Sequence, residues 1–252
     1  MTARQRRWMF LAAAAGLVAF YLWGLVRLPG FGHYPGPYGD IINRVAEGQT
    51  RATGVVSAVN FEYRGFDTVG EEFILFSAAL GVSTVLRRLR DEAEIPAGAD
   101  APALESPAPS EAVRQSALLF TGPIVVMGWY LASHAQTSPS GGFQGGVVLA
   151  TAFILIYLAG QYLVFERFSP VSATEAVGAV GAGGFAAIGL SAVFLGLPYL
   201  SNFLPKGSVP GAVSSSGTIA LISFFVGVEV AAAFVLIVGE LLEQTLLIRR
   251  TG

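Results

Sequence analysis

The chain has 252 residues, of which 53% are hydrophobic and 13% are charged, and its formal net charge is −2. This composition is typical of a membrane protein, and a charge near zero gives no reason to expect a nucleic-acid partner. The chain has no cysteine, which excludes disulfides, cysteine-ligated zinc and iron–sulfur clusters held by this chain, and its two histidines give no reason to expect a His-rich metal or haem site. We expect no metal ion and no cofactor.

The first apolar run, residues 8–28, follows a short basic segment with three arginines. Roughly 20 apolar residues are enough to cross a bilayer as a helix. A signal peptide begins in the same way, but this run is long and the sequence around Pro29 is a poor cleavage site. We therefore expect a retained helix whose N-terminus lies in the cytoplasm, because basic residues favour that side.

Residues 50–64 are too polar to span a membrane, yet apolar side chains recur in them at helical spacing. This pattern predicts a short amphipathic helix on the outer face of the membrane or against a neighbouring subunit. An ordinary loop is the alternative.

The second apolar run ends at Leu86 and is too short for a span unless residues 66–72 also lie in the membrane. The span would then carry Asp67, Glu71 and Glu72 at or below the outer boundary. The arginines that follow the run place its other end in the cytoplasm.

Residues 91–113 are rich in Ala, Pro, Asp, Glu and Ser and lack periodicity, which predicts a flexible cytoplasmic linker. The linker divides the chain into two unlike halves. We expect a two-helix membrane unit at 1–90 and a four-helix membrane unit at 114–252.

Four apolar runs follow the linker, at about 118–132, 147–165, 174–197 and 218–242. Together with the first two runs they predict an all-α, multi-pass membrane protein with about six transmembrane helices. Both chain ends would lie in the cytoplasm, because most arginine clusters then fall on that side. We expect the protein in the cell membrane, that is, the cytoplasmic or inner membrane.

Glu229 lies near the middle of the last apolar run. A carboxylate at that depth costs at least ~2.5 kcal/mol unless it is paired, hydrated or protonated, and such residues commonly mark ion or proton paths. Glu240 lies eleven residues further on, on nearly the same helix face. Both acids are candidates for a proton or cation path. Alternatively, Glu240 is simply hydrated at the interface, and Glu229 bonds a neighbouring helix for assembly only.

Asp67 and Glu71 are four residues apart and share a helix face, so their carboxyls could share a proton. Glu72 points about 100° away from Glu71. Arg64 could instead neutralise one of these acids. An ion path and a structural ion pair are both open for this segment.

His134 lies where the third predicted span ends, just before the glycine-rich segment 139–146. A histidine could pass protons near neutral pH, or could be a solvated loop side chain. The glycine-rich segment lacks the Lys-Ser/Thr of a phosphate-binding loop, so we expect no nucleotide site. We expect a backbone turn that packs closely at the membrane edge.

One family hallmark is similar to the stretch Pro139-Ser-Gly-Gly-Phe-Gln-Gly-Gly146 together with the apolar helix after it. This hallmark belongs to the MnhB-type subunit of multisubunit Mrp-type Na⁺/H⁺ antiporters. The second half of the chain therefore looks MnhB-like. Phe224-Phe-Val-Gly-Val-Glu-Val230 resembles the last helix of the same subunit. Ser140 replaces a glycine of the hallmark, and His134 is two positions further from Pro139 than the family's histidine. The hallmark residues present are Pro139, Gly141, Gly142, Phe143, Gly145 and Gly146.

The first half resembles a different antiporter segment. The large subunit of these antiporters has a signature in its C-terminal part that resembles Phe61-Glu-Tyr-Arg-Gly-Phe-Asp-Thr-Val-Gly-Glu71. The same signature also occurs in a related small subunit of membrane-bound hydrogenases. Arg64, Asp67 and Glu71 match that signature, whereas Glu72 is an additional acid.

These resemblances imply an accessory membrane subunit of a multisubunit cation/proton antiporter, with a part in H⁺ or Na⁺ translocation through intramembrane carboxylates. They imply a transport subunit, not an enzyme, with other antiporter-type membrane subunits and in some complexes redox subunits as partners. The alternative is a structural membrane subunit of a complex I-related redox complex, such as a membrane-bound hydrogenase, with no ion path of its own.

Overall fold

The computed structural model describes residues 3–28, 32, 36–86, 109–137 and 140–246. In these ranges the fold is helical, apart from one isolated bridge between Lys206 and Ser216. The elements are α1 (Ala3–Val26), α2 (Tyr38–Thr50), α3 (Val55–Ala58), the π-helical turn η1 (Val59–Tyr63), α4 (Gly65–Leu86), α5 (Glu111–Ser133), α6 (Gly142–Phe168), α7 (Val171–Phe194) and α8 (Thr218–Leu246).

Six of the described helices, α1 and α4 to α8, are long and apolar enough to cross a membrane. This confirms the all-α membrane fold that the apolar runs predict. α4 begins at Gly65, so the acidic stretch before Phe73 belongs to the helix. Most of the predicted linker falls outside the described residues, and the division into units at 1–90 and 114–252 stays a prediction.

The polar segment between α1 and α4 contains more helix than its sequence pattern predicts. α3 and η1 together replace the single helix expected at 50–64, and α2 precedes them. Arg51 has a positive φ of 58°, which turns the chain between α2 and α3. Ile42 and Ala46 of α2 then pack against Ala58.

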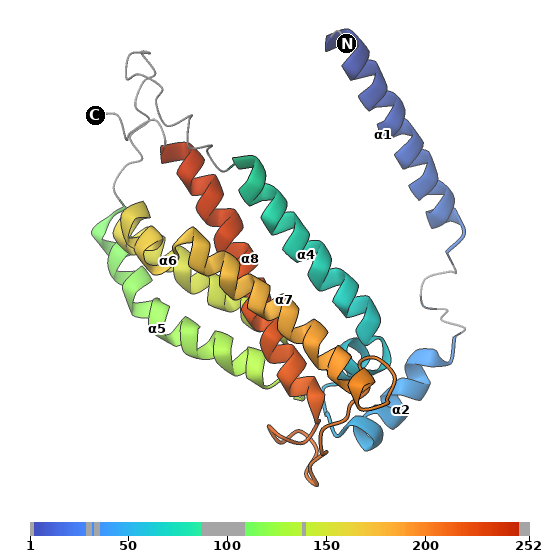
Figure 1. Ribbon diagram of the computed structural model, residues 1–252. Helices are drawn as coiled ribbons and strands as arrows, with labels where there is room; N and C mark the ends of the chain where they lie inside the picture. The colour runs from blue at the N-terminus through green and yellow to red at the C-terminus, as the bar shows by residue number, and fades with distance from the viewer. Residues whose placement is uncertain (1–2, 29–31, 33–35, 87–108, 138–139, 247–252) are drawn as a thin grey trace, which may run out of the picture. The chain divides into compact units, whose positions relative to one another are not determined.

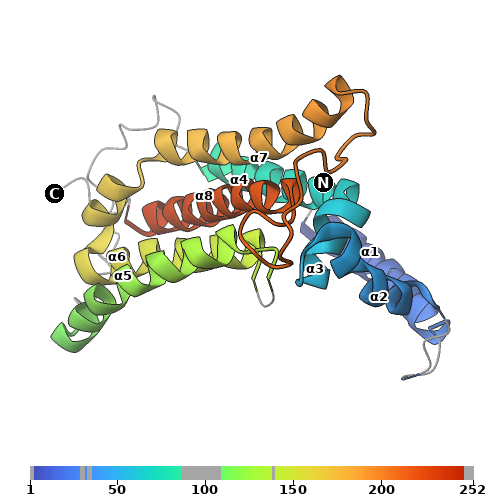
Figure 2. The same ribbon diagram turned by 90° about the horizontal axis from the view of Figure 1, so that it is seen from below.

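α8 is the central helix of the bundle formed by residues 42–246 (Figure 1). Figure 2 shows it between α4 and α7 on one side and α5 and α6 on the other. More than half of its apolar stretch is buried, at 56%, which is the pattern of a helix surrounded by others. α1 belongs to a separate unit, residues 1–41.

Glycines of the segment 139–146 allow α6 to approach two helices closely. A side chain on Gly142 would collide with the Ser223 carbonyl of α8, and one on Gly146 would lie 2.7 Å from the Gly227 carbonyl oxygen. A Cβ on Gly145 would reach the backbone of α5. The beginning of α6 is thereby fixed between α5 and α8.

Candidate functional site

Glu229 lies in the middle of α8, and its side chain is 0% exposed. As a carboxylate it receives no hydrogen bond from a donor group among the described residues. Gly181 of α7 packs directly on it, because a Cβ at Gly181 would be 2.6 Å from the Glu229 backbone nitrogen. A carboxyl enclosed in this way needs a proton, a cation or water to offset its charge.

Glu72 of α4 faces Glu229 closely enough for a hydrogen bond between the two side chains. Glu72 is 4% exposed, and its Oε2 has no partner in the part of the chain that the structure describes. Two ionised carboxylates offer acceptors only, so a bond between them requires a shared proton. The pair can therefore hold a proton, or it can bind a cation when both carboxyls are charged.

A polar cavity of about 210 Å³ adjoins Glu72. The exposed residues Glu71 and Phe143 stand at its edge, so the cavity reaches the protein surface. Its volume is sufficient for several water molecules. Its lining comes from α4, from α3 and η1, from the glycine-rich segment and from α8: Val56, Ser57, Asn60, Phe61, Thr68, Glu71, Glu72, Ser140, Gly141, Gly142, Phe143, Gln144 and Val226.

The acids before Glu72 have other environments. Asp67 is half-exposed and accepts a hydrogen bond of 2.6 Å from Nε of Arg64, with which it also forms an ion pair. The structure thus contains the expected Arg64–Asp67 ion pair, and an ion path through the other acids of the segment stays a prediction. Glu71 is exposed at the edge of the polar cavity, and the sharing of a proton between Glu71 and Asp67 stays a prediction.

A second group of carboxyls lies further along α8. Glu240 is 3% exposed, and Ser83 of α4 donates to it over 2.9 Å. The same hydroxyl lies 3.2 Å from Oε1 of Glu175 on α7. A hydroxyl has one hydrogen, so Ser83 donates to one carboxyl at a time.

His134 follows the last residue of α5. Its ring stacks on Tyr130 at 4.2 Å, and its Nδ1 lies 2.9 Å from the Tyr130 carbonyl oxygen and 3.0 Å from the Ser133 hydroxyl. These contacts hold the ring against its own helix end and not against the carboxyls. Pro139 lies outside the described residues.

Two members of this arrangement, Glu175 and Ser83, are not among the residues that the sequence singles out. Glu175 is the single charged residue of α7, which was a usable signal. Glu72 was a candidate, but its pairing with Glu229 was not foreseen. The spacing of Glu72, Ala79 and Ser83 places all three on one face of α4, and that face meets α8.

Residues 112–236 match a family model described as a domain related to the MnhB subunit of Na⁺/H⁺ antiporters. The chain is 30% identical over 203 residues to an uncharacterized protein of Methanocaldococcus jannaschii, with 70% of this chain and 72% of that protein covered. It is also 30% identical over 180 residues to a probable A/B-type K⁺/H⁺ antiporter subunit of Rhizobium meliloti. That match covers 63% of this chain but 17% of the larger protein.

Two solved structures are similar. One is a chain of the membrane-bound sulfane sulfur reductase, an archaeal respiratory membrane complex, with a TM-score of 0.69 and 26% identity; the match covers 94% of this chain and 98% of that one. The other is a chain of the Mrp complex from Dietzia sp. DQ12-45-1b, with a TM-score of 0.67 and 21% identity. Here the match covers 96% of this chain and 26% of that chain, and it shows a shared fold.

Proposed function

This chain belongs to the family of membrane domains related to the MnhB subunit of Na⁺/H⁺ antiporters, and on that premise we propose that its Glu72–Glu229 pair carries protons or sodium ions. The chain is a membrane subunit of an antiporter-like complex. In the proposal its own task is transport, not catalysis, and its partners are other antiporter-type membrane subunits, with redox subunits in a redox-driven complex.

The observation that carries the proposal is the buried carboxyl of Glu72 in the wall of a polar cavity, with Glu229 facing it. The cavity gives water and ions access to Glu72. Glu72 in turn faces Glu229, which is fully buried and whose carboxylate receives no hydrogen bond from a donor group within the described ranges. One shared proton still leaves a buried carboxyl oxygen of the pair without a donor, which is unfavourable for a site that serves assembly alone, because unsatisfied buried polar groups destabilise a fold.

The cavity wall supports a role in attracting cations. Glu71 adds a negative charge at the edge, while Thr68 and Ser57 bring hydroxyl oxygens. Hard cations prefer such oxygen ligands. In the proposed orientation both chain ends are cytoplasmic in the cell membrane, so the cavity, near the beginnings of α4 and α8, opens toward the outer side.

A structural subunit with no ion path is the second candidate. It is favoured by the likeness to a chain of a respiratory membrane complex along nearly its whole length. In that case a protonated carboxyl in the Glu72–Glu229 pair would only bond α4 to α8. Both candidates predict a buried pair, so the experiment has to separate transport from assembly.

The test replaces Glu72 and Glu229 singly by Gln in the intact complex. Everted membrane vesicles are loaded with a pH-sensitive amine dye, and proton efflux is measured after addition of Na⁺ or K⁺. We expect loss of cation-dependent efflux, with the amount of complex on native gels unchanged. Glu111→Gln, at the exposed start of α5, is the matched control. Efflux at the control rate in both variants would support the structural subunit instead.

A further inference from the structure

A second, much smaller cavity lies between α4, α7 and α8, beyond Glu229 in the direction of Glu240. Its volume is about 10 Å³, close to the smallest space that holds one water. Glu229 lines it at one end, and Glu175 and Thr174 line it at the other. The rest of the wall is apolar or glycine: Phe76, Ala79, Leu80, Gly178, Ala232, Ala233 and Leu236.

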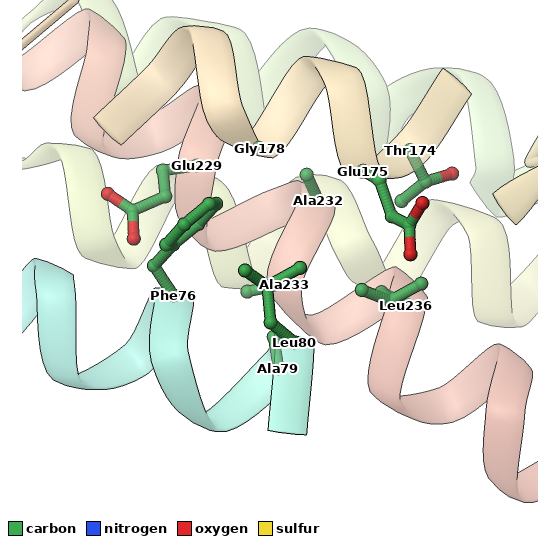
Figure 3. Close-up of a pocket in the computed structure, with 10 residues that line it drawn as sticks. All are labelled: Phe76, Ala79, Leu80, Thr174, Glu175, Gly178, Glu229, Ala232, Ala233 and Leu236. Carbon is green, nitrogen blue, oxygen red and sulfur yellow. The ribbon is translucent and has the colours of Figure 1, made fainter. Parts of the chain in front are cut away.

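Figure 3 shows the Phe76 ring between the two acidic ends of this cavity. The Glu229 carboxyl lies on one side of the ring, and Glu175 lies on the other. The ring therefore separates the two acidic ends. A movement of this side chain would change whether a water can reach both carboxyls.

We propose that Glu175, Ser83 and Glu240 form a second proton-binding station that receives protons from Glu229 through the one-water cavity beside Phe76. This inference rests on the proposed function, because it extends the path that begins at Glu72. It also identifies the transported species in this part of the bundle as the proton.

The small size of the cavity favours a proton over a metal cation as the species that passes through it. Hard cations take several oxygen ligands, about six for Mg²⁺ and about six to eight for Ca²⁺. A space for one water, with two carboxyls and one hydroxyl at its ends and apolar walls, does not supply such a shell. Cations would therefore stay in the wide polar cavity beside Glu72, and protons alone would continue.

The enclosed carboxyl of Glu229 also supports a proton path, and this observation is independent of Glu175 and Glu240. Glu229 is fully buried and lines the small cavity, yet no donor group among the residues that the structure describes bonds its carboxylate oxygens. In Figure 3 the Glu229 oxygens point away from Glu175, so the side chain has to turn toward the cavity before it can bond a water there. A protonated Glu229 that has turned would give its proton to this water, and the water would pass another proton to the Glu175 carboxylate.

Ser83 provides the step between Glu175 and Glu240. Its oxygen is within hydrogen-bond reach of both carboxyls, and its side chain is buried. When Ser83 donates to Glu240, its lone pairs can accept from a protonated Glu175. A shift of both hydrogens then leaves Glu175 ionised and Glu240 protonated, with no net change in charge.

The experiment uses the intact complex and two readouts: cation-dependent proton efflux from everted vesicles, and retention of ²²Na⁺ by the purified complex. We expect Glu175→Gln and Ser83→Ala to lose proton efflux and to retain ²²Na⁺ binding, whereas Glu72→Gln loses both. Glu111→Gln is the control for Glu175→Gln, and Ser77→Ala, exposed on the same helix as Ser83, is the control for Ser83→Ala. Native gels verify assembly of each variant.

The variant Phe76→Ala tests the cavity beside Glu229 independently of the carboxyl and hydroxyl substitutions. It should enlarge the space beside Glu229 and give proton leakage in the absence of added cation, compared with Ile74→Ala on the exposed face of α4.

Efflux at the control rate in Glu175→Gln and Ser83→Ala would overturn the second station, and so would the absence of leakage in Phe76→Ala. If Glu72→Gln and Glu229→Gln also transport normally, the proposed function fails as well. Loss confined to those two variants would leave the proposed function standing without the second station.

Discussion

Glu72 of α4 and Glu229 of α8 face each other inside the bundle, and both side chains are buried. They come from the two halves of the chain that the predicted linker separates. The two halves therefore share one interior around this pair, because α4 packs along α8.

The hydrogen-bonding capacity of the Glu72–Glu229 pair should be better satisfied when one carboxyl is replaced by an amide. Glu72→Gln introduces an N–H donor toward Glu229, and a hydrogen bond of this kind contributes about 1 kcal/mol or more. We expect the variant complex to melt at the same or a higher temperature in a detergent thermal-shift measurement. Glu72→Ala, which removes the group and leaves a cavity, should melt lower. A clear loss of stability in Glu72→Gln would mean that the two side chains do not share a proton.

The packing of α7 on Glu229 should tolerate no side chain at Gly181. A Cβ there would be 2.6 Å from the Glu229 backbone nitrogen, so the helices would have to separate. We expect Gly181→Ala to destabilise the protein by about 1–3 kcal/mol, the usual effect of overpacking. The matched control is Gly183→Ala, because a Cβ at Gly183 meets nothing within 4 Å. The amount of assembled complex on native gels measures both, and equal amounts would contradict the close packing.

The apolar runs of the sequence were sufficient to predict the six long helices, because roughly 20 apolar residues in succession have few other solutions. The depth of Glu229 in its run was likewise enough to single it out. The choice between Glu71 and Glu72 was beyond the sequence. Adjacent residues point about 100° apart on a helix, and only the packing of α4 on α8 decides which one is buried.

Other features escaped prediction because they depend on contacts between distant segments. Glu175 lies near the beginning of its helix, where an acid is easily hydrated, and only the bundle brings it beside Ser83. The turn at Arg51 and the π-helical turn η1 lie in a stretch whose apolar spacing predicts a single α-helix. Their conformation follows from packing on α2 and from the loop that precedes α8.

Asn202 should stabilise the beginning of α8. Its Oδ1 accepts from the backbone N–H of Thr218 at 2.9 Å, and its Nδ2 donates to Glu62 at 2.9 Å. Asn202→Ala would remove the partner of a helix-terminal N–H, a change that costs about 0.5–2 kcal/mol. We expect a lower melting temperature of the complex for this variant, with Ser208→Ala, exposed in the same loop, as control. Identical melting of the two variants would show that the cap does not contribute.

The Arg64–Asp67 pair should contribute little to stability, although both residues match the signature of the large antiporter subunit. Both side chains are largely exposed, at 59% and 49%, and exposed ion pairs are screened by water and salt. Neither residue lines the polar cavity beside Glu72. We therefore expect Asp67→Asn to retain cation-dependent proton efflux in everted vesicles and the melting temperature of the complex. Loss of efflux with unchanged melting would instead assign Asp67 to the ion path. Loss of complex on native gels would show that a neighbouring protein of the complex binds the pair.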